Sequence, residues 1–260
     1  MIHDIGRSAD ALVALHTIAI YACFVMDSAS KITWIADRMI EQFGEVDIEI
    51  LDPIENLVLT ILSQNTTDVN RDRAFASLME TFRTIDRIRV ASQDELAAAI
   101  QVGGLQHQKA RSIRGSLEII MQERGRLELA FLNDLSLSSA LSWLTALPGV
   151  GPKTAGIVLL FSLDRPFFPA DTHIRRVMSR MGLVPARGDP HLQLNKLFPA
   201  DPTLMQQLHL LTIRLGRELC HPKKPLCEGC LLRPECLWLQ THGSTSKDAV
   251  TSPIAKGGSH

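Results

Sequence analysis

One stretch decides how this chain folds: Leu147-Pro148-Gly149-Val150-Gly151-Pro152-Lys153-Thr154-Ala155-Gly156. An apolar-periodic helix is predicted just before it, and Pro152 can begin a second helix because the first helical position needs no amide hydrogen. Gly149 and Gly151 carry no Cβ, so the turn between the helices can be tight and can lie against a flat or anionic surface. The amides of Gly149, Val150 and Gly151 are expected to be free at a helix N-terminus, where they favour a phosphate group. Lys153, in the first helical turn, would face the same ligand.

Such a Leu-Pro-Gly-x-Gly turn is, by itself, equally consistent with an ordinary joint between two packed helices. A second motif follows it along the chain: Asp171-Thr172-His173-Ile174-x-Arg176-Val177. Together the two motifs resemble the helix–hairpin–helix of the endonuclease III family of DNA glycosylases. The resemblance covers roughly residues 31–240. It implies an all-α fold in which two helical lobes flank a DNA cleft.

The resemblance also implies roles for the polar residues of these motifs. Lys153 is expected to attack C1′ of the sugar as a nucleophile, and Asp171 is expected to stabilise positive charge there. The turn and His173 are expected to contact DNA. Relatives that remove a base and also nick the strand carry lysine at the position of Lys153. The sequence therefore predicts a base-excision-repair glycosylase with AP lyase activity on duplex DNA, with oxidised pyrimidines as the family's usual lesion.

Two other functions stay open at this point. One is a monofunctional mismatch glycosylase, a branch of the family that carries another residue in place of Lys153. The other is a non-catalytic helix–hairpin–helix protein that only binds DNA, which would not need both Lys153 and Asp171. An acid at the start of a helix is often only a cap, so Asp171 considered alone is ambiguous.

Two further loops match places where relatives insert side chains into DNA. Relatives carry L-S-x-Q-x-T-D and use the glutamine to fill the gap left by an extruded base. Here Asn65 occupies that position and Gln64 comes one residue early, so which amide would enter the duplex stays open. Leu105, in a G-L-x-x-x-K-A motif, corresponds to a leucine wedge in relatives. Without the resemblance, the first segment is a polar loop and Leu105 closes a corner between helices.

The cysteines form a second, independent signal. Four of the five lie within residues 220–236 in the pattern C-x6-C-x2-C-x5-C, namely Cys220, Cys227, Cys230 and Cys236. The spacing predicts a metal site, and by itself it is consistent with zinc or with an iron–sulfur cluster. The resemblance implies a [4Fe–4S] cluster, because this is the family's cluster pattern. Lys223 and Lys224, between the first two cysteines, are expected to contact DNA phosphates.

The composition is that of a globular protein, with 45% hydrophobic and 21% charged residues in 260. Its net charge of −1 conceals an asymmetry, because residues 37–55 hold seven acids and one arginine. The remainder is therefore net positive, with basic runs over 109–126, 175–187 and 214–224. Overall charge does not exclude a DNA-binding protein, since the placement of charge matters more.

The chain is expected to be nearly all helix, because no segment alternates with a period of two. Helices are predicted over 31–43, 54–62, 69–82, 93–100, 109–122, 138–146, 152–163, 172–182 and 204–219. The expected units are an N-terminal extension (1–30), a helical lobe with the hairpin (52–165), a cluster lobe (31–51 plus 166–240) and a disordered tail (241–260).

The extension contains an apolar run over residues 11–26, which is short for a membrane span. It is interpreted as a docked helix, with a signal or anchor as the alternative. A monomer that works in the cytoplasm on the nucleoid is expected.

Overall fold

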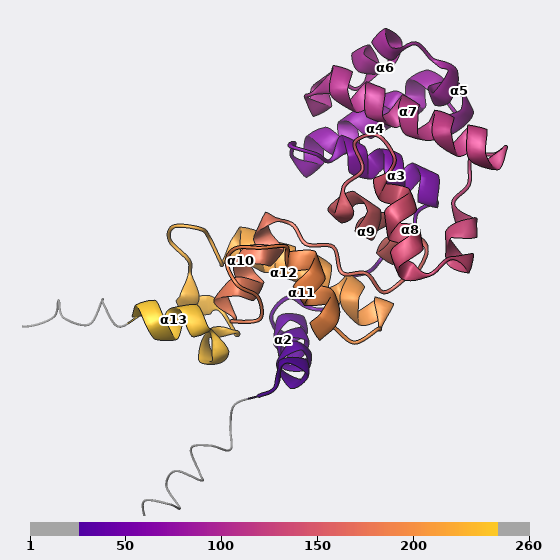
Figure 1. Ribbon diagram of the computed structural model, residues 1–260. Helices are drawn as coiled ribbons and strands as arrows, with labels where there is room; N and C mark the ends of the chain where they lie inside the picture. The colour runs from indigo at the N-terminus through magenta and orange to yellow at the C-terminus, as the bar shows by residue number, and fades with distance from the viewer. Residues whose placement is uncertain (1–25, 244–260) are drawn as a thin grey trace, which may run out of the picture.

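The structure is a computed structural model that describes residues 26–243 (Figure 1). In this part of the chain every regular element is helical, and the predicted all-α fold is confirmed. The α-helices are α2 (Ser28–Phe43), α3 (Pro53–Leu62), α4 (Asp68–Phe82), α5 (Ile85–Val90), α6 (Gln93–Ala99), α7 (Gln106–Arg124), α8 (Leu137–Thr145), α9 (Pro152–Ser162), α10 (Thr172–Arg180), α11 (Pro190–Leu197), α12 (Pro202–Glu218) and α13 (Leu237–His242). Four short 3-10 helices accompany them: η1 (Gln101–Gly103), η2 (Ala130–Asp134), η3 (Cys227–Gly229) and η4 (Arg233–Glu235).

All nine predicted helices are present, with ends that differ by a few residues. Three short helices, α5, α11 and α13, have no counterpart in the prediction. Helices of six to eight residues make barely two turns, so they carry little hydrophobic periodicity. The start of α5 is fixed locally instead, because the Thr84 side chain accepts a hydrogen bond from the Arg87 amide at 3.3 Å.

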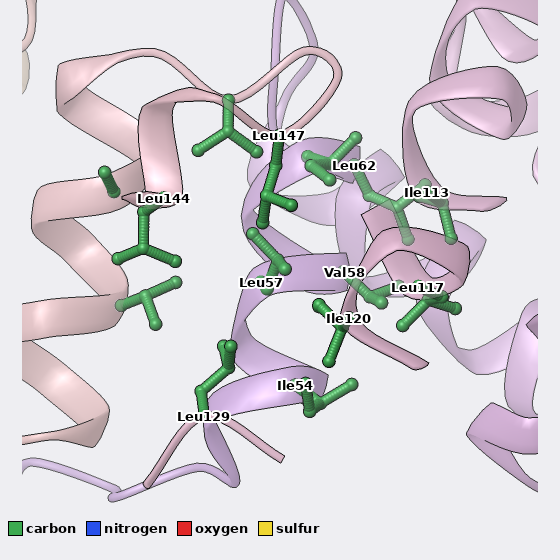
Figure 2. Packing of buried hydrophobic residues seen from close by; sticks show 14 of the residues in the cluster. Ile54, Leu57, Val58, Leu62, Ile113, Leu117, Ile120, Leu129, Leu144 and Leu147 are labelled. Carbon is green, nitrogen blue, oxygen red and sulfur yellow. The ribbon is translucent and has the colours of Figure 1, made fainter. Parts of the chain in front are cut away.

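A first hydrophobic cluster is built from α3 to α9, the upper group of helices in Figure 1. Its centre is α3, which packs against α4, α7 and α9. Leu57 and Ile61 of this helix are completely buried, as its nearly unbroken apolar sequence predicts. Leu147, from the hairpin, reaches into the same cluster beside Leu62 and Leu57 (Figure 2). The hairpin is thereby fixed to the core of this lobe.

A second hydrophobic cluster combines the two ends of the described chain. Helix α2 packs against α11 and α12, and α10 packs against α12 and α13. Phe168 and Phe198 stack at 4.1 Å between ring centroids within this cluster. Helix α9 joins the two clusters, because Leu159 belongs to the first and Leu160 to the second. The helix that begins at the hairpin therefore runs from one lobe into the other.

Several predicted boundaries differ from the structure. Helix α2 begins at Ser28, inside the segment assigned to the N-terminal extension. The predicted tail starts at residue 241, whereas α13 continues to His242. The ring of His242 stacks on that of Trp238, with 5.0 Å between the centroids. The apolar run over 11–26 lies almost wholly outside the described residues, as does the remainder of the predicted tail. Within residues 26–243, no helix is both long and apolar enough to cross a membrane.

Candidate active site between the two lobes

The hairpin packs directly against α7. Gly149 has φ of +73°, and a Cβ at this position would lie 2.3 Å from the Oγ of Ser112. Only glycine meets both conditions, since another residue would be strained and would also collide with Ser112. Gly151 differs, because a Cβ there would meet no atom within 4 Å, and it precedes α9 as an exposed residue.

One of the three amides predicted to be free is in use. The Val150 amide donates to the carbonyl of Leu147 at 3.1 Å, closing the turn, and the Val150 side chain is buried. The prediction of a free amide at Val150 is therefore wrong. Helix α9 has no side-chain cap, so the amides of its first turn add to those of Gly149 and Gly151. Among the described residues, no side chain caps the N-terminus of α9, so its backbone N–H groups stay available to an anion.

Lys153 and Asp171 line the same cavity. It has a volume of about 990 Å³, and its walls come from both lobes. Lys153 enters from the first turn of α9, and Asp171 from the start of α10. One oxygen of Asp171, Oδ1, accepts a hydrogen bond from the Ile174 amide at 2.8 Å. Asp171 is thus a helix cap, as the simpler interpretation has it, and the same side chain also faces the cavity.

His209 is a residue of this cavity that sequence reasoning missed. Its ring is 4% exposed and makes edge contacts with Phe161 and Phe168. The ring Nδ1 lies 3.0 Å from the carbonyl of Pro169, so Nδ1 carries the proton and donates it. Burial lowers the pKa of His209 to about 4, against the opposing charge of Asp171. A neutral imidazole therefore lies beside the Asp171 carboxylate at neutral pH.

An ion pair crosses the cavity between the lobes. Asp68, the first residue of α4, lies 2.6 Å from the guanidinium of Arg217 on α12 and 3.3 Å from that of Arg71. The hydrogen bond from Arg217 lowers the pKa of Asp68 and keeps it ionised. By residue type, either Thr67 or Asp68 could cap α4. Thr67 accepts from the Asn70 amide and is the cap, which leaves Asp68 for the ion pair.

The loop that precedes α4 separates the two candidate amides. Gln64 Nε2 donates to the carbonyl of Gly149 at 2.9 Å and lies 3.4 Å from Thr154 Oγ1, so its side chain is bound to the hairpin. Asn65 is exposed, lines the cavity and has φ of +51°. Leu105 has the same φ, is 47% exposed and immediately precedes α7. A left-handed conformation costs a non-glycine residue on the order of 1–3 kcal/mol, so the surrounding structure must hold both loops.

His173 joins the cavity to the cysteine loop. It lines the cavity, and its Nδ1 lies 3.1 Å from Nη2 of Arg176. The same guanidinium donates through Nε to the carbonyl of Cys220 at 2.8 Å. The second motif is therefore joined to one of the metal-ligand candidates, Cys220, through the backbone carbonyl of that cysteine.

The four cysteines line one small cavity. Arg180 donates through Nη1 to the sulfur of Cys220 at 3.1 Å and to the carbonyl of His221 at 2.8 Å. Burial raises the pKa of the Cys230 thiol, and the neighbouring cysteines raise it further. Lys223 and Lys224 are exposed on the loop between the first two cysteines.

Four thiols share this cavity, which is the number of protein ligands that a [4Fe–4S] cluster takes. Thiolates are also ligands of zinc, so the residue types fit either group.

Comparison with known proteins decides the family. Residues 58–199 match the model of the HhH-GPD superfamily of base excision DNA repair proteins. The chain belongs to this family. Endonuclease III of Thermotoga maritima is 34% identical over 194 residues, which cover 74% of this chain and 86% of that protein. Endonuclease III of Sulfolobus acidocaldarius is 38% identical over 191 residues, covering 69% and 79%.

The structural comparison agrees. A non-covalent endonuclease III–DNA complex superimposes with a TM-score of 0.70 at 26% identity, covering 85% of this chain and 100% of that one. A thermostable thymine-DNA glycosylase has the same fold, with a TM-score of 0.68 at 18% identity, covering 83% and 100%. The resemblance to endonuclease III is confirmed, and this HhH-GPD protein is a DNA glycosylase of base excision repair.

Proposed function

We propose that this HhH-GPD glycosylase also nicks DNA as an AP lyase, with Lys153 as nucleophile and Asp171 as the carboxylate beside C1′. One observation carries the proposal: both side chains line the cavity between the lobes. An amine and a carboxylate in one cavity are what attack at C1′ requires, because the sugar gains positive charge as the base departs. His209 is neutral there, so no imidazolium cancels the charge of Asp171.

In the proposed reaction, each bond that forms is matched by a bond that breaks, and each proton that is lost is taken up elsewhere. The neutral amine of Lys153 forms a bond to C1′ while the bond from C1′ to the base breaks, and the base leaves with that electron pair and takes up a proton. The bond from C1′ to the ring oxygen then breaks, and the ring oxygen takes up a proton from the attached nitrogen, which opens the sugar and leaves a protonated Schiff base. This Schiff base loses a proton from C2′, the bond from C3′ to oxygen breaks, and the 3′ phosphate departs with that electron pair. Water then releases Lys153. Asp171 favours the first step by electrostatic stabilisation of the sugar.

The substrate we propose is duplex DNA with an oxidised pyrimidine or an abasic site. A trapped endonuclease III–DNA covalent intermediate, which superimposes with a TM-score of 0.67 at 25% identity, supports DNA as the substrate and a covalent step on it, and the choice of lesion rests on the resemblance to the family. Gly149, Gly151, Lys223 and Lys224 are proposed as phosphate contacts, through amides or charge, and His173 as a neighbouring DNA contact. Since Gln64 is bound to the hairpin, Asn65 is the amide proposed to fill the gap. Leu105 is proposed as the apolar wedge.

We propose a [4Fe–4S] cluster as cofactor, held by Cys220, Cys227, Cys230 and Cys236. Bound there, it supplies a covalent tie across the C-terminal loop. The protein residues between the first two cysteines are then fixed, so that Lys223 and Lys224 face DNA. Iron and sulfide content of purified protein tests this, and protein that holds zinc and no sulfide would refute it. We also propose that the protein is a monomer and that it acts in the cytoplasm, on the DNA of the nucleoid.

Borohydride trapping tests the lyase. Wild type, Lys153→Ala and a control, Lys196→Ala on the exposed face of α11, are mixed with duplex DNA that carries one abasic site. A covalent adduct is expected with wild type and the control and is expected to be absent with Lys153→Ala. If wild type binds the duplex but forms no adduct, the lyase proposal fails and a monofunctional glycosylase is favoured.

A further inference from the structure

Lys109 is the one fully buried lysine of the described residues. Its side chain, on α7, is 1% exposed, although Lys109 begins a basic run of the sequence. The ammonium Nζ donates to two backbone carbonyls, those of Leu62 and Gly103, each at 2.8 Å. No carboxylate of residues 26–243 pairs with it, and burial lowers its pKa. An apolar side chain could fill the same space without the cost of burying a charge, so packing alone does not account for a lysine at this position.

The two carbonyls share a position in the fold. Leu62 is the last residue of α3, and Gly103 is the last residue of η1, so each carbonyl belongs to a helix end with few partners. Asn65 follows the first within three residues, and Leu105 follows the second within two. Asn65 and Leu105 are called the wedge residues below. Lys109 thus binds both chain segments just before each one delivers a wedge residue.

The two segments also pack in the same part of the lobe. Helix η1 contacts α4, the helix that begins directly after the loop of Asn65. Both wedge residues have a positive φ, and Leu105 adopts the left-handed conformation that a leucine avoids. An ammonium has three donors and can bind two carbonyls together, whereas separate caps would leave the loops independent.

We propose that Lys109 is a positioning residue that couples the two wedges, so that Asn65 and Leu105 enter a damaged duplex as one unit. The inference rests on the proposed DNA-binding roles of the wedge residues. It does not depend on the lyase.

The test measures unstacking without chemistry. The duplex carries a tetrahydrofuran abasic analogue, which has no aldehyde for Lys153 to attack, with 2-aminopurine beside it. The fluorescence of 2-aminopurine rises when the bases next to it unstack. Binding is measured separately, by the fluorescence anisotropy of a labelled strand. Lys109→Met keeps the length and removes the donors. We expect its fluorescence rise at saturation to be at least threefold smaller than that of wild type or of Lys196→Met, with affinity changed less than threefold.

A role in stability alone is distinguished by a second comparison. In the Asn65→Ala/Leu105→Ala background, adding Lys109→Met is expected to lower the fluorescence rise by less than a further 1.5-fold, because no wedges remain to be positioned. An equal loss in both backgrounds, or a full rise with Lys109→Met, would overturn the proposal.

The third comparison leaves Lys109 intact and applies even if Lys109→Met does not fold. Asn65→Ala and Leu105→Ala are compared singly and together by the same fluorescence measurement. Coupled wedges predict that the double variant loses at least threefold less than the product of the two single losses. Independent, multiplicative losses would refute the coupling. If wild type forms no adduct in the borohydride assay but the wedge losses are coupled, the lyase proposal fails and the coupling of the wedges is still supported.

Discussion

Acidification should destabilise the fold through His209. Folding buries this ring in neutral form and lowers its pKa from 6.5 to about 4. The stabilising contribution of the neutral ring is therefore complete above pH 6.5 and is lost as the pH falls towards 4. By linkage, the loss reaches about 2 kcal/mol at pH 5 and about 3 kcal/mol at pH 4.

Urea unfolding followed by circular dichroism at pH 7, 6 and 5 measures this contribution. His209→Asn is the matched variant, since its side-chain amide can still donate to the Pro169 carbonyl but does not titrate. Acid effects on other groups, including the cysteine site, are common to both proteins and cancel in the difference. We expect the wild type to lose about 2 kcal/mol more than the variant between pH 7 and 5. Parallel pH dependence of the two proteins would refute the assignment of a buried, neutral His209.

Three other perturbations follow from the packing. Gly149→Ala should lower the free energy of unfolding by about 1–3 kcal/mol and weaken DNA binding, because the added Cβ would collide with Ser112. The control Gly151→Ala adds a Cβ in open space and should leave stability unchanged, so equal melting temperatures of the two variants would contradict the prediction. Leu57→Ala, at a completely buried position of α3, should cost about 2–5 kcal/mol in urea unfolding, and a loss under 1 kcal/mol would mean that the site collapses around the gap. Asp68→Asn removes a partly exposed ion pair between the lobes and should change the free energy of unfolding by less than about 1 kcal/mol, so a larger loss would show that the pair is buried from solvent.

Local sequence patterns were sufficient for most of the secondary structure. The hairpin, α3 and α12 could be predicted because apolar spacing, proline and glycine act over a few residues. Helices as short as α5 and α13 carry too few turns for a period and were missed. The unpaired state of the Val150 amide was predicted wrongly, since the turn closes with a hydrogen bond that composition does not reveal.

Side-chain roles were less accessible. Gln64 and Asn65 are adjacent amides of similar chemistry, and only the bond from Gln64 to the hairpin, 85 residues away, separates them. Lys109 is the first residue of a basic run in the sequence, and its local sequence does not show that its ammonium is buried between two loops. His209 stands in an ordinary apolar run, and nothing nearby in sequence marks it as part of a cavity.

The sequence by itself determined the helical architecture, the hairpin, the cysteine spacing and the family. These depend on residue type at short, fixed spacing, which local backbone preferences translate directly into structure. Only the tertiary structure decided which side chains share the cavity, which charges are buried and which are paired, as for Asp68 and Arg217, 149 residues apart. The physical reason is that burial and electrostatic environment arise when distant segments pack together, and they set protonation and hydrogen bonding for groups whose local sequence is unremarkable.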